Sequence, residues 1–177
     1  MKWLLLAGLL CTLLVAWRSF ARADDTPAVG DAAPPFRLND QHGKSRSLED
    51  FKGKWLALYF YPKDDTPGCT EQACKFRDDL HQLTAMGAEV VGISVDDSAS
   101  HADFAKKHSL PFALLADENG EVARRYGSLM NLGVIKFAKR NTFLIDPQGR
   151  IAKVYLKAST SRNSAEVIAD LRRLALK

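Results

Sequence analysis

Seven consecutive apolar residues constrain the fold of this chain more than any other feature. They run from Trp55 to Tyr61 with the sequence WLALYFY. An uninterrupted apolar run of this length is typical of a β-strand buried on both faces, in a sheet that helices cover on its two sides. Pro62 ends the run, because proline has no N–H group to donate to a neighbouring strand. The sequence therefore predicts a central strand of an α/β domain.

Helix-like and strand-like segments alternate along the rest of the chain. Apolar residues three or four positions apart predict an amphipathic helix over 70–86 that Gly87 ends. An Asn-Asp-Gln-His-Gly turn at 39–43 predicts a small N-terminal hairpin, and a capping box from Asn163 to Glu166 predicts the start of the last helix. We expect further strands over 89–95, 112–116, 142–146 and 151–156, further helices over 98–108 and before Tyr126, and little regular structure over 127–139.

This order of elements predicts one domain. Helical connections between buried strands, followed by a hairpin and a final helix, indicate a three-layer α/β architecture. The chain of 177 residues has no internal repeat and no linker, and its length suits one core. We place the domain at 32–177 and a flexible lead-in at 24–31.

The first 23 residues have the pattern of a secretory signal peptide. Lys2 precedes an uncharged, leucine-rich stretch over 3–17, and Ala21-Arg22-Ala23 forms a small-residue cleavage site before Asp24. The alternative is a retained membrane anchor. Fifteen helical residues extend only about 22 Å, less than the ~30 Å of a bilayer's hydrocarbon core. We therefore predict cleavage, a periplasmic location and no stable membrane association, with a membrane tether if the segment is not cleaved.

Composition excludes several other classes of protein. A hydrophobic fraction of 46% with 26% charged residues is not that of a disordered chain. Three of the 25 basic residues and none of the 21 acidic residues lie in 1–23, so the remainder is nearly neutral. Its basic residues are scattered, and we expect no nucleic-acid partner. Three cysteines are too few for a disulfide scaffold or a four-thiolate zinc site.

The segment PKDDTPGCTEQAC, residues 62–74, concentrates the reactive side chains. Thr66 suits the N-cap of the helix and Pro67 its first position, which places Cys69 in the first turn. Unpaired N–H groups at a helix N-terminus stabilise an anion and favour the thiolate form of a cysteine. Glu71 and partial burial oppose this effect, so the sequence requires a basic partner for Cys69 from elsewhere in the fold.

Cys74 lies five residues after Cys69. On a helix this spacing separates the Cα atoms by roughly 8–9 Å, more than the ~7 Å that a disulfide bridges. Pairing therefore requires the helix to unwind, which favours a reversible disulfide over a permanent structural one. Metal binding is the weaker alternative, because no histidine has ligand spacing to the pair. We interpret Asp64-Asp65 as a solvated loop, and His81, His101 and His108 as residues on polar helix faces.

The pattern Pro62-x-x-x-Thr66-x-x-Cys69 resembles the active-site motif of the peroxiredoxins. The longer stretch FYPKDDTPGCTEQACKFRD, residues 60–78, is similar to the Q-type, or bacterioferritin-comigratory, subfamily. The similarity continues through VVGISVDD, KKHSLPFALLADENG and RNTFLIDPQGRI, and so extends over nearly all of 32–177.

The resemblance implies a thioredoxin-like fold, with a central mixed sheet flanked by helices and an N-terminal β-hairpin extension. It also implies site roles. Cys69 would be the peroxidatic cysteine and Cys74 the resolving one. Thr66 would donate a hydrogen bond to the peroxide and the thiolate, Pro62 would shield the pocket from water, and Arg140 would supply the cation.

The implied activity is that of a thiol-dependent peroxidase with no cofactor and no metal. Its substrates would be hydrogen peroxide and organic hydroperoxides, its reductant a thioredoxin-like dithiol protein, and its state a monomer. The stretch 127–139, GSLMNLGVIKFAK, departs from the subfamily pattern at the expected pocket rim. Two alternatives remain, a thioredoxin-like thiol–disulfide exchange protein, which would normally carry C-x-x-C, and a non-catalytic redox sensor.

Overall fold

Strand β3 (Trp55–Phe60) lies inside a seven-stranded mixed sheet, as its apolar sequence predicts. The computed structural model describes residues 26–175. Strand β3 pairs in parallel with β4 (Ala88–Ser94) and antiparallel with β8 (Thr142–Ile145). The sheet order is β2-β1-β5-β4-β3-β8-β9, in which β1 (Arg37–Asp40) and β2 (Ser45–Ser47) form the expected N-terminal hairpin. The remaining strands are β5 (Ala113–Ala116) and β9 (Ile151–Tyr155).

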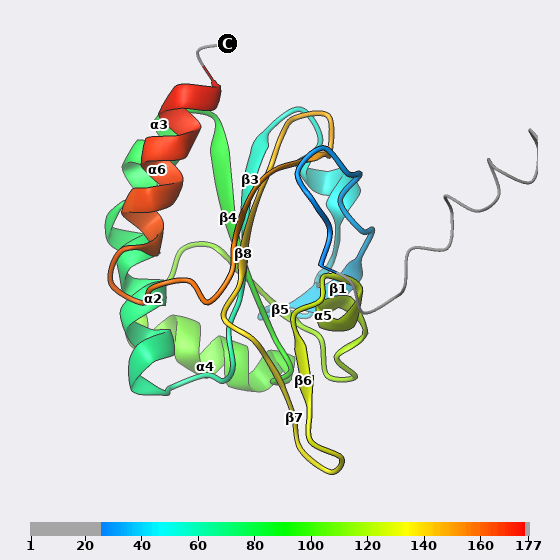
Figure 1. Ribbon diagram of the computed structural model, residues 1–177. Coiled ribbons are helices and arrows are strands. Elements are labelled where there is room, and N and C mark those ends of the chain that lie inside the picture. The colour runs from blue at the N-terminus through cyan, green and yellow to red at the C-terminus, as the bar shows by residue number, and fades with distance from the viewer. Residues whose placement is uncertain (1–25, 176–177) are drawn as a thin grey trace, which may run out of the picture.

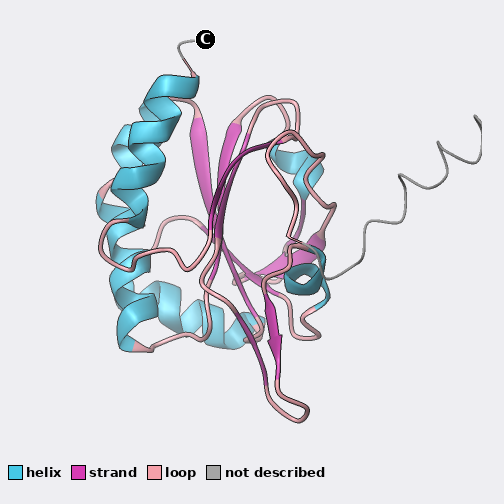
Figure 2. Ribbon diagram, viewed as in Figure 1, coloured by secondary structure: helices cyan, strands magenta, loops and turns pink. Residues whose placement is uncertain are grey.

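Helices cover both faces of this sheet (Figures 1 and 2). One face carries α2 (Pro67–Asp78), α3 (Leu80–Ala85), α4 (Ser98–His108) and α6 (Asn163–Leu174). The other face carries the short helices η1 (Leu48–Phe51) and α5 (Glu121–Arg125). The predicted α/β architecture with a mixed sheet flanked by helices is confirmed.

The side chains of β3 alternate between two apolar cores. Ala57 and Tyr59 contribute to the core beneath α2, α4 and α6, whereas Leu58 and Phe60 contribute to the core beneath α5. All four are fully buried, which explains why the strand has no polar position. Because the strand is fixed on both faces, the loop that follows it starts from a rigid point.

The helix expected over 70–86 is two helices in the structure. It begins at Pro67 with Thr66 as N-cap, but breaks at Asp79 between α2 and α3. The carboxylate of Asp79 accepts a hydrogen bond from Ser164 Oγ on α6 at 2.7 Å. This bond between distant segments has no signature in the local apolar spacing, so the sequence pattern could not locate the break.

The stretch over 127–139 is a hairpin, although the sequence predicts little regular structure there. Strands β6 (Leu129–Asn131) and β7 (Lys136–Ala138) pair antiparallel, outside the main sheet. The turn between them exposes three apolar side chains, with Val134 99% accessible, and Gly133 adopts a φ of 85° there. Three-residue strands with solvent-facing apolar tips lack the alternation by which strands are recognised.

The predicted capping box at Asn163 is wrong. Arg162 occupies the N-cap position of α6, and the side chain of Asn163 points into the protein. Its Oδ1 accepts hydrogen bonds from Gln72 Nε2 at 2.9 Å and from Thr142 Oγ1 at 2.7 Å. These buried donors would be left unpaired if Asn163 capped its own helix, and that cost exceeds the gain from a cap.

The predicted signal peptide over 1–23 lies outside the described residues. Of the lead-in over 24–31, Gly30 and Asp31 exchange backbone hydrogen bonds of 2.8 and 2.9 Å with Ile151, so they are attached to β9 instead of free. Within 26–175, no helix has the length and apolar character that crossing a bilayer requires.

Candidate active site

The first turn of α2 holds Cys69 where the sequence predicts it. Thr66 is the N-cap and Pro67 the first helical residue, so Cys69 is the third. The thiol is free and its residue is 1% exposed, packed into the core beneath α2. The first turn of a helix carries unpaired N–H groups, and this position therefore favours the thiolate form of Cys69.

Arg140 supplies the cation that the sequence argument requires. Its Nη2 donates a hydrogen bond to Cys69 Sγ at 3.3 Å. Its Nη1 donates to Gln72 Oε1 at 2.7 Å, so the guanidinium group contacts two residues of the same helix. Arg140 lies between β7 and β8 and is 71 residues away from Cys69 in the chain. The fold therefore brings together a thiol and a fixed positive charge.

Gln72 is a member of this site that the sequence reasoning missed. It is 0% exposed and joins Arg140 to Asn163 of α6 through its two amide ends. The sequence contained one signal for this role. Gln72 is a polar residue three positions after Cys69 and beside Ala73, on the apolar face of α2. Buried amides are retained where both ends are paired, so Gln72 fixes the direction of the Arg140 side chain.

Thr66 and Pro62 lie in the loop between β3 and α2, and both are half-buried. The hydroxyl of Thr66 donates to the carbonyl oxygen of Lys63 at 3.0 Å, instead of to the Cys69 thiol as the resemblance implies. A hydroxyl group has a single proton to donate. Because Thr66 donates it to Lys63, it has none to donate to the Cys69 thiol. Of the five predicted site residues, Cys69 and Arg140 are in direct contact.

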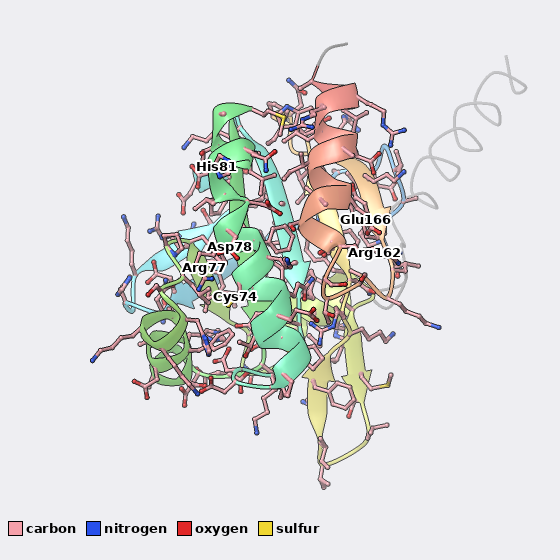
Figure 3. All side chains as sticks on the ribbon, turned by 90° about the vertical axis from the view of Figure 1, so that its left-hand side faces the viewer. Cys74, Arg77, Asp78, His81, Arg162 and Glu166 are labelled. Carbon is pink, nitrogen blue, oxygen red and sulfur yellow. The ribbon has the colours of Figure 1, made fainter. Side chains whose placement is uncertain are left out.

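Cys74 lies on the same helix as Cys69 but on the outer face of the helix layer (Figure 3). It is partly exposed and its thiol is free, and α2 continues without a break from Pro67 to Asp78. Figure 3 also shows α6 beside α2 on this face. A disulfide between the two cysteines therefore requires α2 to unwind and to give up contacts with α6.

Tyr59 lies in the core under α2 and stacks on Phe76, with 5.0 Å between the ring centroids. Burial raises the pKa of Tyr59 well above its ordinary value, so its hydroxyl stays neutral and protonated. Tyr59 and Phe76 thus add no charge to this part of the core, and the charged group in contact with the thiol is Arg140.

Two further expectations about this region are wrong. Asp64 is 7% exposed, not solvated, and His101 is 0% exposed, not on a polar face. His101 Nδ1 lies 2.8 Å from Asp64 Oδ2. Each polar side chain can be buried because the other is its hydrogen-bond partner. The two residues come from different segments, so no local sequence pattern reveals the pair. Asp65 is exposed, as expected.

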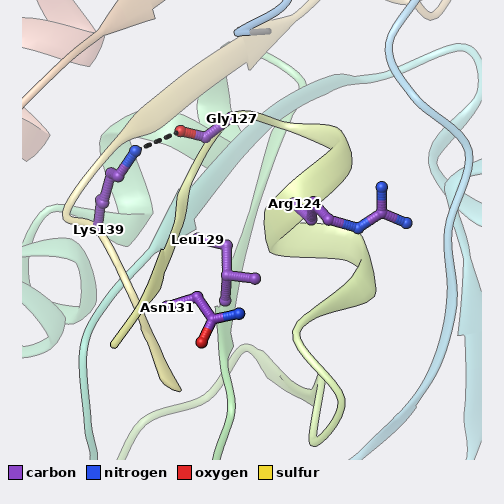
Figure 4. Close-up of a pocket in the computed structure, with 5 residues that line it drawn as sticks. All are labelled: Arg124, Gly127, Leu129, Asn131 and Lys139. Atoms are coloured by element: carbon purple, nitrogen blue, oxygen red, sulfur yellow. Dashed lines mark hydrogen bonds between the residues drawn. The ribbon is translucent and has the colours of Figure 1, made fainter. Parts of the chain in front are cut away.

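A hollow of about 310 Å³ lies at the base of the β6–β7 hairpin (Figure 4). Arg124, Gly127, Leu129, Asn131 and Lys139 line it, and Lys139 Nζ donates to the Gly127 carbonyl at 3.2 Å. None of these residues belongs to the predicted site. Among residues 26–175, no three histidine, cysteine, aspartate or glutamate side chains form a set of metal ligands.

Comparison with known proteins agrees with this geometry. Residues 29–154 match the AhpC/TSA family. The putative peroxiredoxin bcp of Coxiella burnetii is 45% identical over 147 residues, which is 81% of this chain and 97% of that protein. The peroxidoxin BcpB structure from Mycobacterium tuberculosis superposes with a TM-score of 0.80 at 34% identity, covering 84% of this chain and 98% of the other.

A third relative is the bacterioferritin comigratory protein of Xanthomonas campestris, whose structure was studied for alkyl peroxide reduction. It is 30% identical with a TM-score of 0.74, covering 79% of this chain and 92% of that one. These similarities confirm the thioredoxin-like fold and extend over the helix that carries both cysteines. The chain belongs to the AhpC/TSA family and, within it, to the peroxiredoxin Q/Bcp subfamily of thiol-dependent peroxidases.

Proposed function

We propose that Cys69 is the peroxidatic cysteine of this peroxidase and that Cys74 resolves its oxidised form within the same chain. The observation that carries the assignment is the 3.3 Å contact between Arg140 Nη2 and Cys69 Sγ in the first turn of α2. A guanidinium group and helix N–H groups around one sulfur stabilise a thiolate and orient it for attack.

In the first step the Cys69 thiolate attacks the terminal oxygen of a hydroperoxide. The O–O bond breaks, a sulfenic acid forms on Cys69, and the other oxygen leaves as water or alcohol after taking a proton. Arg140 and the N–H groups of the first turn stabilise the negative charge that moves from sulfur to the leaving oxygen. Pro62 shields the site from water, and Thr66 donates to the peroxide once its hydroxyl turns away from Lys63.

In the second step α2 unwinds and the Cys74 thiol attacks the sulfenic sulfur. A disulfide forms between Cys69 and Cys74, and the sulfenic oxygen leaves as water. The partial exposure of Cys74 supports this role, because it lies at the surface where an unwound segment is free to move. An external dithiol then reduces the disulfide by exchange and is itself oxidised.

We propose hydrogen peroxide and organic hydroperoxides as substrates and a thioredoxin-like protein as the reductant. The study of alkyl peroxide reduction in the Xanthomonas campestris relative supports the organic substrates. The disulfide of step two joins two cysteines of the unwound segment, one of them at the surface, and a dithiol protein reduces such a bond by exchange. The exposed apolar turn of the β6–β7 hairpin does not indicate which dithiol protein is the reductant.

Stopped-flow measurement of peroxide loss tests the assignment. We expect Cys69→Ser to abolish peroxide consumption. Cys74→Ser should consume about one equivalent of peroxide and then fail to recycle with a dithiol protein, because only Cys69 reacts with peroxide. Repeated turnover by Cys69→Ser would refute the proposal. Exchange activity toward insulin without peroxide consumption would instead indicate a thiol–disulfide exchange protein.

We also propose that residues 1–23 export the protein to the periplasm and are removed, and that the mature protein is a monomer. The support is the sequence pattern of the segment, with Lys2, an apolar stretch and Ala21-Arg22-Ala23. N-terminal sequencing of protein from a periplasmic extract should begin at Asp24, and its sedimentation should give one chain. A mature N-terminus at Met1 would contradict cleavage.

A further inference from the structure

The carboxylate of Asp64 collects three side-chain hydrogen bonds beneath the loop that precedes Cys69. Tyr61 donates its hydroxyl to Oδ1 at 2.8 Å, and Ser100 donates its hydroxyl to Oδ2 at 2.8 Å. His101 Nδ1 lies 2.8 Å from the same Oδ2. Ser100 and His101 belong to α4, outside the loop, whereas Tyr61 begins the loop directly after β3. The catalytic steps above use none of these groups.

His101 depends on this carboxylate for its position. The imidazole is 0% exposed, and its Nε2 has no hydrogen-bond partner within the described part of the chain. On the other side of the ring, Nδ1 is 2.8 Å from Asp64 and 3.4 Å from the Tyr61 hydroxyl. A buried polar ring with one unpaired nitrogen costs free energy, so its remaining bond to Asp64 is the interaction that offsets this cost.

One more bond attaches the same loop to the carboxyl end of β4, and a second bond holds its acceptor, Asp96, in place. The backbone N–H of Asp64 donates to Asp96 Oδ2 at 3.0 Å, and Ser94 Oγ donates to that oxygen at 2.7 Å. The next residue, Asp65, adopts a left-handed φ of 56°. A non-glycine residue in this region is held there by its surroundings, which here include the anchored Asp64.

The position of this loop decides the position of Cys69. Asp64 lies two residues before the N-cap Thr66, whose carbonyl accepts the N–H of Thr70 at 2.9 Å and so begins α2. If Asp64 is released, the loop loses its buried attachment to α4 and keeps only the exposed pairs of Asp65 with Lys107 and His108. Cys69 then departs from the 3.3 Å contact with Arg140.

We infer that Asp64 and His101 are positioning residues that hold the first turn of α2 folded for the reaction with peroxide. The inference rests on the proposed function, in which the folded turn reacts with peroxide and the unwound turn forms the disulfide. Weakening the Asp64–His101 pair therefore affects the two steps differently. Sulfenic acid formation slows because fewer molecules hold Cys69 beside Arg140, whereas disulfide formation keeps its rate or accelerates.

Single-turnover quenched flow with mass spectrometry separates the steps, since reduced, sulfenic and disulfide forms differ in mass. In Asp64→Ala we expect the second-order rate with peroxide to fall about tenfold, the scale of one lost charge-assisted hydrogen bond. The rate of disulfide formation should not fall. Asp65→Asn is the matched control in the same loop. Its exposed ion pairs contribute little, and asparagine tolerates the left-handed backbone, so both steps should stay within about twofold of wild type.

A second pair of variants tests His101 without truncating the loop. Asparagine places an N–H near the position of the imidazole Nδ1, whereas leucine fills the space with no donor. We expect His101→Leu to slow the peroxide step as Asp64→Ala does, and His101→Asn to recover most of the rate. If Asp64→Ala does not fold, the comparison of His101→Leu with His101→Asn still tests the positioning role.

Three results would overturn the inference. They are a peroxide rate in Asp64→Ala within twofold of wild type, equal slowing of both steps, and equal rates in His101→Asn and His101→Leu. Equal slowing would mark a general loss of structure instead of positioning. Failure of the wild-type protein itself to consume peroxide would refute the proposed function, and so is distinguishable from all three.

Discussion

A single guanidinium group supplies the positive charge in contact with Cys69. Arg140 uses its two terminal nitrogens at once, one toward Cys69 Sγ at 3.3 Å and one toward Gln72 Oε1 at 2.7 Å. Lysine carries the same charge but has no planar fork, so it cannot contact both groups in this geometry. The residue type at this position therefore matters beyond its charge.

We expect Arg140→Lys to lower the second-order rate of peroxide reduction by about 10²-fold, the usual effect of removing one oriented donor from a reaction centre. Arg172→Lys, on the exposed side of α6, is the matched control and should leave the rate unchanged. Stopped-flow kinetics under single turnover measures both. A rate for Arg140→Lys equal to that of the control would mean that charge alone is sufficient.

Asp40 is a buried carboxylate whose partners make stability depend on pH. Burial by itself raises the pKa of Asp40, but hydrogen bonds from Arg46 and from the N–H groups of His42 and Lys44 outweigh it. They hold the pKa below its ordinary value of 3.8. A carboxyl group with a lowered folded-state pKa stabilises the fold above its unfolded pKa, and this contribution is lost as the pH falls through the lowered value.

Asp40→Asn should therefore lower the free energy of unfolding near neutral pH and lower it by less at about pH 2, because the wild-type carboxyl gains its proton as the pH falls through the lowered pKa. Urea denaturation at both pH values measures the difference. Asp103→Asn, at an exposed position of α4, should leave both values as in wild type. A loss of equal size at both pH values would show that the carboxylate charge contributes nothing.

At the scale of elements, the break at Asp79 divides one helical layer into two parts. Both cysteines lie on α2, whereas α3 has its own attachment to the core through Leu83, which is 0% exposed. Unwinding that starts at the first turn of α2 can therefore stop at Asp79 without releasing α3. The break therefore favours a proposed unwinding that is confined to α2, the helix that carries both cysteines.

Hydrogen exchange measured by mass spectrometry tests this division. We expect oxidation to the disulfide to raise exchange of backbone amides over 67–78, while 80–85 and strand β3 keep the protection of the reduced protein. Cys74→Ser treated with the same peroxide is the control, because it cannot form the disulfide. Increased exchange throughout 80–85 would show that α2 and α3 unwind as one helix.

At the scale of the whole molecule, the last element of the chain completes the layer over the sheet. Helix α6 packs its buried residues Val167, Ile168 and Leu171 into the core that also contains Cys69. It also supplies Asn163, the partner of Gln72. The site near residue 69 is thus complete only with the C-terminal helix in place.

Leu171→Ala should lower the free energy of unfolding by roughly 2–5 kcal/mol, because leucine at 0% exposure leaves a cavity on truncation. Arg172→Ala, next along the helix and exposed, should change it by less than about 0.5 kcal/mol. Equilibrium denaturation in urea measures both. Equal small effects would show that α6 is not part of the cooperative core.

Local patterns predicted the parts of the structure that depend on neighbouring residues. The helix over 98–108 and the N-terminal position of Cys69 on α2 follow the sequence closely, because caps and apolar spacing act within one or two turns. The break at Asp79 and the inward turn of Asn163 do not, since each depends on a hydrogen bond to a residue far along the chain. The family motif added Arg140, which its local sequence would present as an ordinary strand-end arginine.

The sequence by itself determined the central strand, the helix that begins at Thr66 and the thiol in its first turn, because short-range sterics, capping and burial decide these. The tertiary structure decided what surrounds that thiol. Arg140 and Cys69 are 71 positions apart, and His101 and Asp64 are 37 apart. Contacts of this range form only when the sheet order brings the ends of β3, β4 and β8 together. A buried charge or imidazole is stable in such a place only where its partner arrives from another segment.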